Sequence, residues 1–210
     1  MKIFKLIDKF WPYKITLNNI NKNKKIKNFF KRMILSFYFF FLSLFNFLLA
    51  NLPFFTLRTL LLRMIGWKIG KSVSIHRGIT ITSLKAPSSI QDYSVINKGC
   101  VLDNRRKINI GKNVSLSQGV IIYTLGHDIN HPDFITKGSS VTISDYVVIF
   151  SRACIMPGVT LGYGSVVLPH SVVSKKVEDF HVVGGNPATF KCHREKNFSY
   201  KLDYRVWHGI

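Results

Sequence analysis

The sequence predicts a mainly β fold, a parallel β solenoid built from six-residue units, with a helical segment in front of it. Two observations lead to this prediction. From residue 69 onward, an aliphatic residue recurs at every sixth position over most of the chain, and a small or β-branched residue follows four places later. Ahead of this repeat, the run from Met33 to Leu57 contains no charged residue. We therefore expect a basic segment, an apolar helical segment, the solenoid and a tail, over residues 1–32, 33–68, 69–190 and 191–210.

The charge of the chain favours an anionic partner. Its 210 residues carry a formal net charge of +20, and residues 1–32 hold ten Lys or Arg and one acid, Asp8. Such an excess attracts phospholipid surfaces, nucleic acid or phosphorylated small molecules. Because no platform of interleaved aromatic and basic residues accompanies it, we expect no nucleic-acid partner. The concentration of charge beside an apolar run favours an anionic membrane surface instead.

The apolar segment is long enough to span a bilayer, and three arrangements fit it. A single transmembrane helix would place Lys22–Arg32 in the cytosol and the remaining chain outside. A monotopic hairpin or interfacial helix pair, broken near Pro53, would keep both ends in the cytosol. A helix buried over the end of the solenoid needs no membrane. We favour the second arrangement, which predicts a cytoplasmic protein held peripherally or monotopically on the cytoplasmic face of the inner membrane.

The repeat is clearest over residues 143–178, where six units follow one another without interruption. Their first positions are aliphatic: Ile143, Ile149, Ile155, Leu161, Val167 and Val173. Alternate side chains of a strand face opposite ways, so these positions all point inward. Six residues suit a short strand and a bend, and three units would close one triangular coil. A single unit cannot bury its apolar face, so coils must stack, with their strands paired in parallel.

One stretch interrupts the repeat. Residues 123–140, YTLGHDINHPDFITKGSS, fit no six-residue unit, and the pattern resumes at Val141. A long polar insertion in a regular array is a candidate functional loop. It carries two of the seven histidines, His127 and His131. Imidazole has an unperturbed pKa near ~6.5, which suits it to proton transfer at neutral pH.

The repeat of residues 69–190 resembles the hexapeptide-repeat acyltransferases, whose fold is a left-handed parallel β-helix. This handedness is an exception to the usual right-handed crossover, and it comes from the resemblance, not from the period. The string GHDINHPDF, residues 126–134, resembles the loop motif of the galactoside, maltose and polysaccharide O-acetyltransferases. The lead-in up to Gly70 resembles the helical lead-in of members that modify polysaccharides.

The resemblance implies an O-acetyltransferase that moves an acetyl group from acetyl-CoA, as co-substrate, to a hydroxyl of a carbohydrate such as a surface or capsular polysaccharide unit. His127 matches the catalytic base of the motif and would take the proton of the hydroxyl as it attacks the thioester. Asp128 or a backbone carbonyl would orient its ring. Backbone N–H groups at a coil corner would stabilise the oxyanion.

The resemblance also implies residues that bind the acceptor: Asn97, Asp103, Asp128 and His131. The alternative for Asn97 is a residue that fills a repeat turn, for Asp103 a solvated side chain, and for His131 an ordinary loop residue. We expect no metal, because His127 and His131 lie four residues apart in a loop without helical periodicity and no third ligand is identifiable.

Coenzyme A would lie along the later coils. Ser151 and Ala153 match the motif that contacts its pantetheine arm. Ser174 and Lys175 match a Thr-Lys pair of the family near the adenine and phosphate, with a solvated turn as the alternative for Lys175. Lys191 follows the closing segment GGNPA and would pair with the 3′-phosphate.

Two other functions stay open at this point. A drug-modifying O-acetyltransferase of the same fold is disfavoured by the apolar lead-in, because a soluble drug needs no membrane site. A non-catalytic solenoid that binds a partner is disfavoured by His127 and the GGNPA segment. Phe150 stands where many relatives have Gly, which leaves the shape of the donor pocket open. The resemblance implies a homotrimer with sites between subunits, and residues 191–210 would cap the last coil or pack on a neighbouring subunit.

Overall fold

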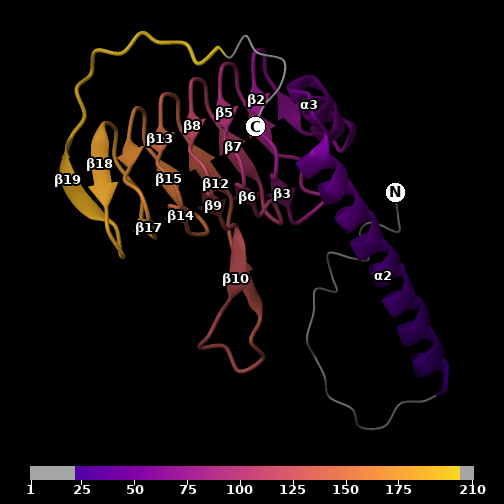
Figure 1. The fold of residues 1–210 in the computed structure, drawn as a ribbon. Helices are drawn as coiled ribbons and strands as arrows, with labels where there is room; N and C mark the ends of the chain where they lie inside the picture. Colours follow the sequence, from indigo (N-terminus) through magenta and orange to yellow (C-terminus); the bar gives the residue numbers. More distant parts are fainter. Residues whose placement is uncertain (1–21, 204–210) are drawn as a thin grey trace.

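Two helices lead into a parallel β-helix in this computed structural model, which describes residues 22–203 (Figure 1). The helices are α2 (Lys22–Asn51) and α3 (Phe55–Met64). The predicted basic segment up to residue 21 and the end of the predicted tail, 204–210, lie outside the described residues. Because α2 begins at Lys22, the expected boundary between basic and apolar segments falls inside one helix.

The β-helix has three faces, each a parallel sheet. The first face consists of β1 (Lys68–Ile69), β4 (Ser89–Ile90), β7 (Ile108–Ile110), β12 (Val141–Ile143) and β15 (Thr160–Leu161). The second consists of β2 (Ser74–Ile75), β5 (Val95–Ile96), β8 (Ser115–Leu116), β13 (Val148–Ile149), β16 (Val166–Val167), β18 (His181–Gly184) and an antiparallel last strand, β19 (Thr189–His193). The third consists of β3 (Thr80–Ile81), β6 (Val101–Leu102), β9 (Ile121–Ile122), β14 (Cys154–Ile155) and β17 (Val172–Val173).

The six-residue period sets the register of the sheets. On the first face, Ile69 pairs with Ile90, Ile90 with Ile110, Ile110 with Ile143, and Ile143 with Leu161. First-position residues of successive coils therefore lie above one another, and from Ile90 onward they are at most 1% exposed. Each buried aliphatic side chain contributes about 1.5–3 kcal/mol, so this column stabilises the stacking of the coils. The predicted parallel solenoid is confirmed.

The helical lead-in covers the open end of the first coil. One face of α2 packs on the solenoid through Leu42 and Leu49, and the Asn46 side chain both donates to Ile81 O and accepts from Ile81 N, each at 2.9 Å. The buried Arg58 of α3 donates to carbonyls of the helix connection and to Ile75 O. Side chains of the two helices thus bind backbone groups of the edge strands β2 and β3, which no further coil pairs within residues 22–203.

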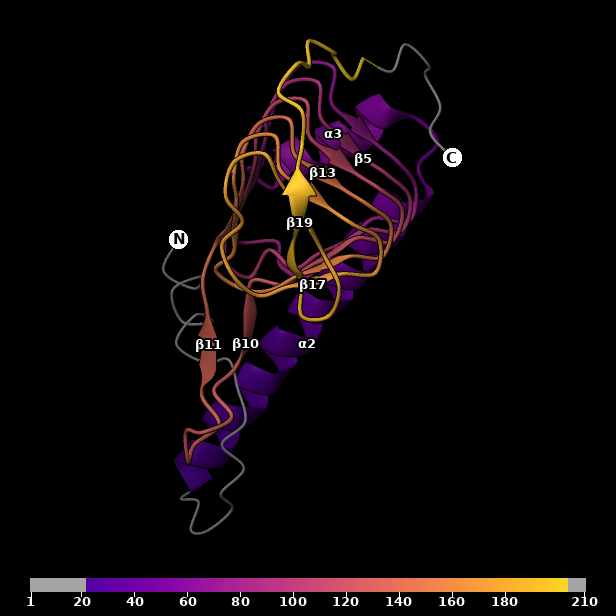
Figure 2. The same ribbon diagram turned by 90° about the vertical axis from the view of Figure 1, so that its left-hand side faces the viewer.

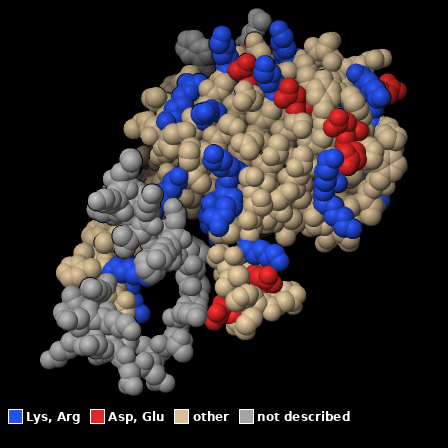
Figure 3. All heavy atoms as spheres, turned by 180° about the vertical axis from the view of Figure 1, so that it is seen from behind, with Lys and Arg blue, Asp and Glu red and all other residues tan. Residues whose placement is uncertain are grey.

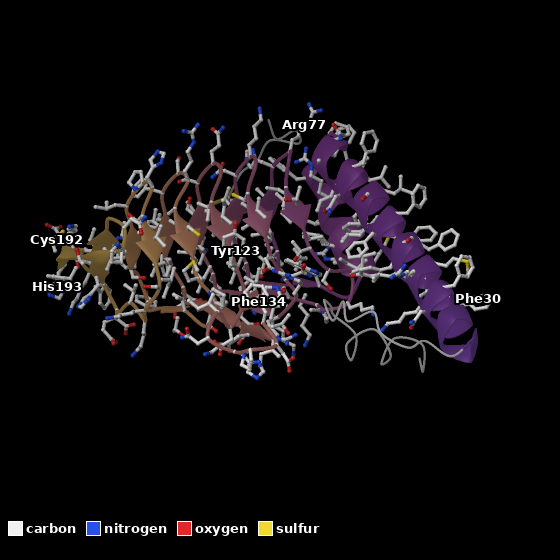
Figure 4. All side chains as sticks on the ribbon, turned by 90° about the horizontal axis from the view of Figure 1, so that it is seen from below. Phe30, Arg77, Tyr123, Phe134, Cys192 and His193 are labelled. Atoms are coloured by element: carbon white, nitrogen blue, oxygen red, sulfur yellow. The ribbon has the colours of Figure 1, made fainter. Side chains whose placement is uncertain are left out.

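The opposite face of α2 is apolar and exposed. Phe37, Phe40, Phe41 and Phe47 are 56–63% exposed, and Figure 4 shows Phe30 and other rings of α2 directed away from the solenoid. Within residues 22–203, the stretch Asn28–Asn51 is long and apolar enough to cross a membrane, although a core helix or a signal sequence would pass the same test. Only 11% of its most apolar window is buried. The third arrangement expected from the sequence, a helix buried over the end of the solenoid, therefore accounts for one face of α2 alone.

The tail continues past β19 and runs back along one corner of the solenoid (Figure 1). The Arg194 guanidinium donates to Tyr146 O at 2.8 Å and to Gly164 O at 3.1 Å. Further on, the Phe198 ring packs on the Tyr146 ring, with centroids 5.0 Å apart, and Leu202 N donates to the Asn113 side chain. The tail therefore binds corners of its own solenoid, from the last coils back toward the first.

Candidate active site

The interruption of the repeat is an antiparallel hairpin that projects from the rod (Figures 1 and 2). Its strands are β10 (Leu125–His127) and β11 (Thr136–Gly138), with His127 opposite Thr136. It leaves the solenoid after β9, at the corner between the third and first faces. The loop predicted from the sequence thus presents His127 outside the packed core.

The ring of His127 is held by Phe134 from the other side of the hairpin. Its Nδ1 lies 2.8 Å from Phe134 O, and the two rings stack with centroids 4.3 Å apart and planes 4° apart. Because a carbonyl only accepts, Nδ1 carries the hydrogen in the neutral ring, and Nε2 is the basic nitrogen. The ring is half-buried. A proton acceptor of defined direction is thus presented at the surface.

Asp128 does not orient this ring. Its carboxylate binds Lys137 Nζ at 3.0 Å across the hairpin and accepts from Asn130 N at 3.1 Å. The hydrogen bond from Lys137 holds the pKa of Asp128 below its ordinary value. Of the two ring-orienting groups expected from the sequence, the structure selects the backbone carbonyl.

His131 lies in the hairpin tip, where its Nδ1 accepts from Asp133 N at 3.1 Å. Its backbone carbonyl accepts from Phe134 N at 2.8 Å, and its own N–H donates to Asp128 O at 3.2 Å. His131 therefore shapes the turn that brings Phe134 back over His127.

Asp103 lies beneath the base of the hairpin and is 1% exposed. Oδ1 accepts from Thr82 Oγ1 at 2.6 Å and from Arg105 Nε at 2.8 Å and N at 3.2 Å. Oδ2 accepts from Arg105 Nη2 at 2.9 Å and from the backbone N–H groups of Thr124 and Leu125 at 3.2 and 3.3 Å. This corrects the alternative of a solvated Asp103. Because Asp103 is 1% exposed, it also has no exposed oxygen for the expected contact with the acceptor.

The hydrogen bonds decide the charge state of Asp103. Burial alone would raise the pKa of its carboxyl, but hydrogen bonds from Arg105 and Thr82 outweigh that effect and hold the pKa below its ordinary value. The same carboxylate raises the pKa of the Arg105 guanidinium. Both partners are therefore charged at neutral pH.

Asn97 fills the turn between β5 and β6 and binds the next coil. Its backbone N–H and its Nδ2 both donate to Leu116 O, at 2.9 and 2.8 Å. The side chain is half-buried on the corner between the second and third faces, whereas the hairpin leaves from the next corner. Within one chain, Asn97 and His127 therefore lie on different corners.

The expected coenzyme residues divide between corners. Ser151 and the fully buried Ala153 lie between β13 and β14. The backbone N–H of Ala153 donates to Phe150 O and its carbonyl accepts from Ile121 N, so Ala153 presents no exposed group to a ligand. Ser174 and Lys175 are exposed after β17, on the same corner as the hairpin, and Lys191 is exposed in β19. The exposed ring of Phe150 lies one residue before Ser151.

No pattern in the sequence pointed to the role of Phe134, because pairing within the insertion has no period. Thr82 and Thr124 were likewise missed, whereas Arg105, two residues after Asp103, was a local signal for an ion pair. Among residues 22–203, no group of three or more His, Cys, Asp or Glu is placed to hold a metal ion. A cavity of about 450 Å³ between α3 and the first coil contains none of the expected site residues.

No family model matches the chain. Among curated proteins, WcaF of Escherichia coli (strain K12), whose name assigns it to colanic acid biosynthesis as an acetyltransferase, is 32% identical over 131 residues, covering 62% of this chain and 71% of WcaF. Galactoside O-acetyltransferase of the same strain is 32% identical over 106 residues and is covered to 51%. An Escherichia coli chloramphenicol acetyltransferase is 38% identical over 77 residues, but only 37% of it is covered.

Solved structures agree with the fold. A hexapeptide-repeat containing acetyltransferase from Vibrio cholerae is 25% identical, with a TM-score of 0.69 over 74% of this chain and 89% of that one. A maltose O-acetyltransferase from Clostridium difficile 630 is 27% identical, with a TM-score of 0.67 over 78% and 89%. The fold is thus the parallel β-helix expected from the repeat, in the left-handed form that the resemblance implied.

Proposed function

We propose a function from the premise that this chain belongs to the hexapeptide-repeat acetyltransferases: it transfers an acetyl group from acetyl-CoA to a hydroxyl of a carbohydrate. The similarity to WcaF spans most of that protein, and its name supports a polysaccharide unit as acceptor. The observation that carries the proposal is the geometry of His127, a projecting imidazole whose Nδ1 is bound by the Phe134 carbonyl.

His127 acts as general base in this mechanism. As the acceptor oxygen attacks the acetyl carbonyl, Nε2 takes its proton, and the Phe134 carbonyl stabilises the imidazolium that forms. The tetrahedral intermediate collapses with cleavage of the C–S bond, and the imidazolium returns the proton to the leaving thiolate. Backbone N–H groups at a coil corner supply the oxyanion stabilisation. The proton balance closes without a covalent enzyme intermediate.

The remaining site residues follow from the family motifs. Ser151 contacts the pantetheine arm beside the buried Ala153, and Ser174, Lys175 and Lys191 bind the adenine and phosphate end. Asn97, Asp128 and His131 contact the acceptor. Because Asn97 and the hairpin lie on different corners of one chain, a homotrimer that joins them between subunits accounts for the arrangement.

The proposed acceptor also indicates where in the cell the enzyme acts. The exposed apolar face of α2, together with the +20 charge of the chain, supports attachment to an anionic membrane from the cytoplasmic side. There the enzyme meets a lipid-linked glycan. The similarity to chloramphenicol acetyltransferase favours a drug acceptor as the second candidate, and the outer face of α2 has no role in that case.

The proposal is tested by a His127→Ala variant in an assay of thiol release from acetyl-CoA, with polysaccharide repeat units and chloramphenicol as acceptors. Removal of a general base costs about 10²–10⁴-fold in kcat, while KM for acetyl-CoA stays the same. His193→Ala, at the far end of the solenoid, is the matched control and keeps full activity. Transfer by His127→Ala at the normal rate would refute the mechanism, and transfer to chloramphenicol alone would select the second candidate.

A further inference from the structure

Arg105 and Asp103 form a link between the body of the solenoid and the first strand of the hairpin. Arg105 sits on the corner after β6, one coil before the hairpin, and binds Asp103 through two parallel hydrogen bonds of 2.8 and 2.9 Å. A bidentate pair of this kind fixes orientation as well as charge. Asp103 in turn holds Thr82 of the coil before, so the link spans three successive coils.

The link closes on a single residue of the hairpin. Leu125 N donates to Asp103 Oδ2 at 3.3 Å, and Leu125 O accepts from Arg105 Nη2 at 2.9 Å. Both backbone polar groups of Leu125 are therefore bound by the pair, and its side chain is buried. Thr124 adds a second attachment, because its hydroxyl donates to Asp103 O at 2.6 Å and accepts from Arg106 N at 2.8 Å.

The ion pair between Lys137 and Asp128 lies within the hairpin and does not join it to the solenoid. Lys137 in β11 binds Asp128, which follows β10; the side chain of Lys137 is 73% exposed and that of Asp128 is 25% exposed. The Arg105 side chain is 26% exposed and that of Asp103 is 1% exposed. Exposed pairs contribute little, whereas removing one partner of a buried pair leaves an uncompensated charge. The hairpin is thus held to the rod at Leu125, two residues before His127.

We infer that Arg105 is a positioning residue: with Asp103 it fixes the direction in which the hairpin leaves the solenoid, and thereby places the imidazole of His127 for proton transfer. The inference rests on the proposed function only in its last step, the use of His127 as base. It assigns Asp103 to support of the hairpin instead of contact with the acceptor. A displacement of about 1 Å at a reacting group can cost about 10²-fold in rate, so loss of the link is expected to lower kcat.

The test compares Arg105→Gln with Lys137→Gln, which removes the cation of the exposed hairpin pair. In Arg105→Gln, hydrogen exchange of the amides in residues 124–138 is expected to accelerate about 10-fold or more, while the strands of the later coils exchange as before. In the same variant kcat falls about 10–100-fold, and KM for acetyl-CoA changes less than about two-fold. Lys137→Gln changes neither exchange at the hairpin base nor kcat.

Arg105→Lys separates positioning from charge. A lysine keeps the positive charge but cannot form both parallel bonds and the bond to Leu125 O, so intermediate exchange and intermediate kcat are expected. This variant decides the question if Arg105→Gln fails to fold. Unchanged exchange in either Arg105 variant overturns the link, and faster exchange with unchanged kcat overturns positioning. Full activity of His127→Ala overturns the proposed function and leaves the exchange result standing.

Discussion

Asp103 is a buried carboxylate in a strongly basic chain, and its charge is balanced inside its own coil by Arg105. Every donor on it comes from the corner at which the hairpin begins or from the coil before. The Asp103 carboxylate therefore neutralises Arg105 and at the same time binds the backbone where the hairpin begins. Its neighbour Asn104 binds the preceding coil without a charge, because its buried amide binds backbone groups of Ser83 and Ala86.

The lowered pKa of Asp103 predicts an acid-sensitive contribution to stability. The pKa of this carboxyl is lower in the folded state than in the unfolded state, where it is about 3.9. The ionised carboxylate therefore stabilises the fold at pH values above the unfolded pKa, and this stabilisation is lost as pH falls through the folded pKa. Asp103→Asn is therefore expected to be less stable at pH 7 and to lose less on acidification below about pH 4. Urea unfolding of the unaltered chain and the variant at a series of pH values measures how the free energy of unfolding depends on pH in each.

Asp128→Asn is the control for that measurement. The pKa of Asp128 is also lowered, mainly by the hydrogen bond from Lys137, but its side chain is 25% exposed and its partner Lys137 is 73% exposed, so its loss should change the pH dependence of stability little. If Asp103→Asn unfolds in acid as steeply as the unaltered chain, the carboxylate of Asp103 does not supply the acid-sensitive stability.

At the scale of elements, strands and loops differ in how far the sequence predicts them. The strands follow from the period, because each first-position aliphatic must face inward, and Ile143 and Leu161 pair as the period requires. The hairpin could be located as an interruption, but its register could not be predicted, since it depends on nonperiodic contacts such as Phe134 on His127. The path of the tail depends on contacts such as Arg194 with Tyr146, 48 residues apart, which no local pattern encodes.

The hairpin itself contains a matched pair of glycines that tests its geometry. A Cβ on Gly138 would lie 2.2 Å from Thr124 O and 2.7 Å from Leu125 Cα, which are backbone atoms that cannot move cheaply. A Cβ on Gly126, in the facing strand, would meet only Lys137 O at 4.0 Å. The base of the hairpin is therefore closed so tightly that β11 requires glycine at residue 138.

We expect Gly138→Ala to open the hairpin base and to lower kcat about 10-fold or more, because His127 would lose its fixed position. Gly126→Ala should keep near-normal kcat, and the melting temperature of the rod should change little in both variants. The thiol-release assay and thermal unfolding provide the two measurements. Equal activity of the two variants would mean that the close contact at Gly138 is not needed for catalysis.

At the scale of the whole molecule, the charged surface and the apolar helix face lie on different parts of the structure. Figure 3 shows Lys and Arg distributed over the visible face of the solenoid instead of gathered into one stripe. The exposed rings, in contrast, follow one side of α2. A helix that is apolar all round is ordinarily buried or in contact with lipid, and α2 is buried on one face only. Attachment to a membrane would cover the other face.

This attachment is tested by replacing Phe37, Phe40, Phe41 and Phe47 together with Ser. Each exposed ring that enters the interface contributes about 1.5–3 kcal/mol, so the fourfold variant is expected to bind anionic phospholipid vesicles at least about 10-fold more weakly in a sedimentation assay. Phe190→Ser, an exposed ring on β19, is the control and should bind normally. The solenoid contacts of Leu42 and Leu49 are untouched, so the unfolding temperature should hold. Normal vesicle binding by the fourfold variant, with a changed oligomeric state, would mean that a neighbouring chain covers this face instead of lipid.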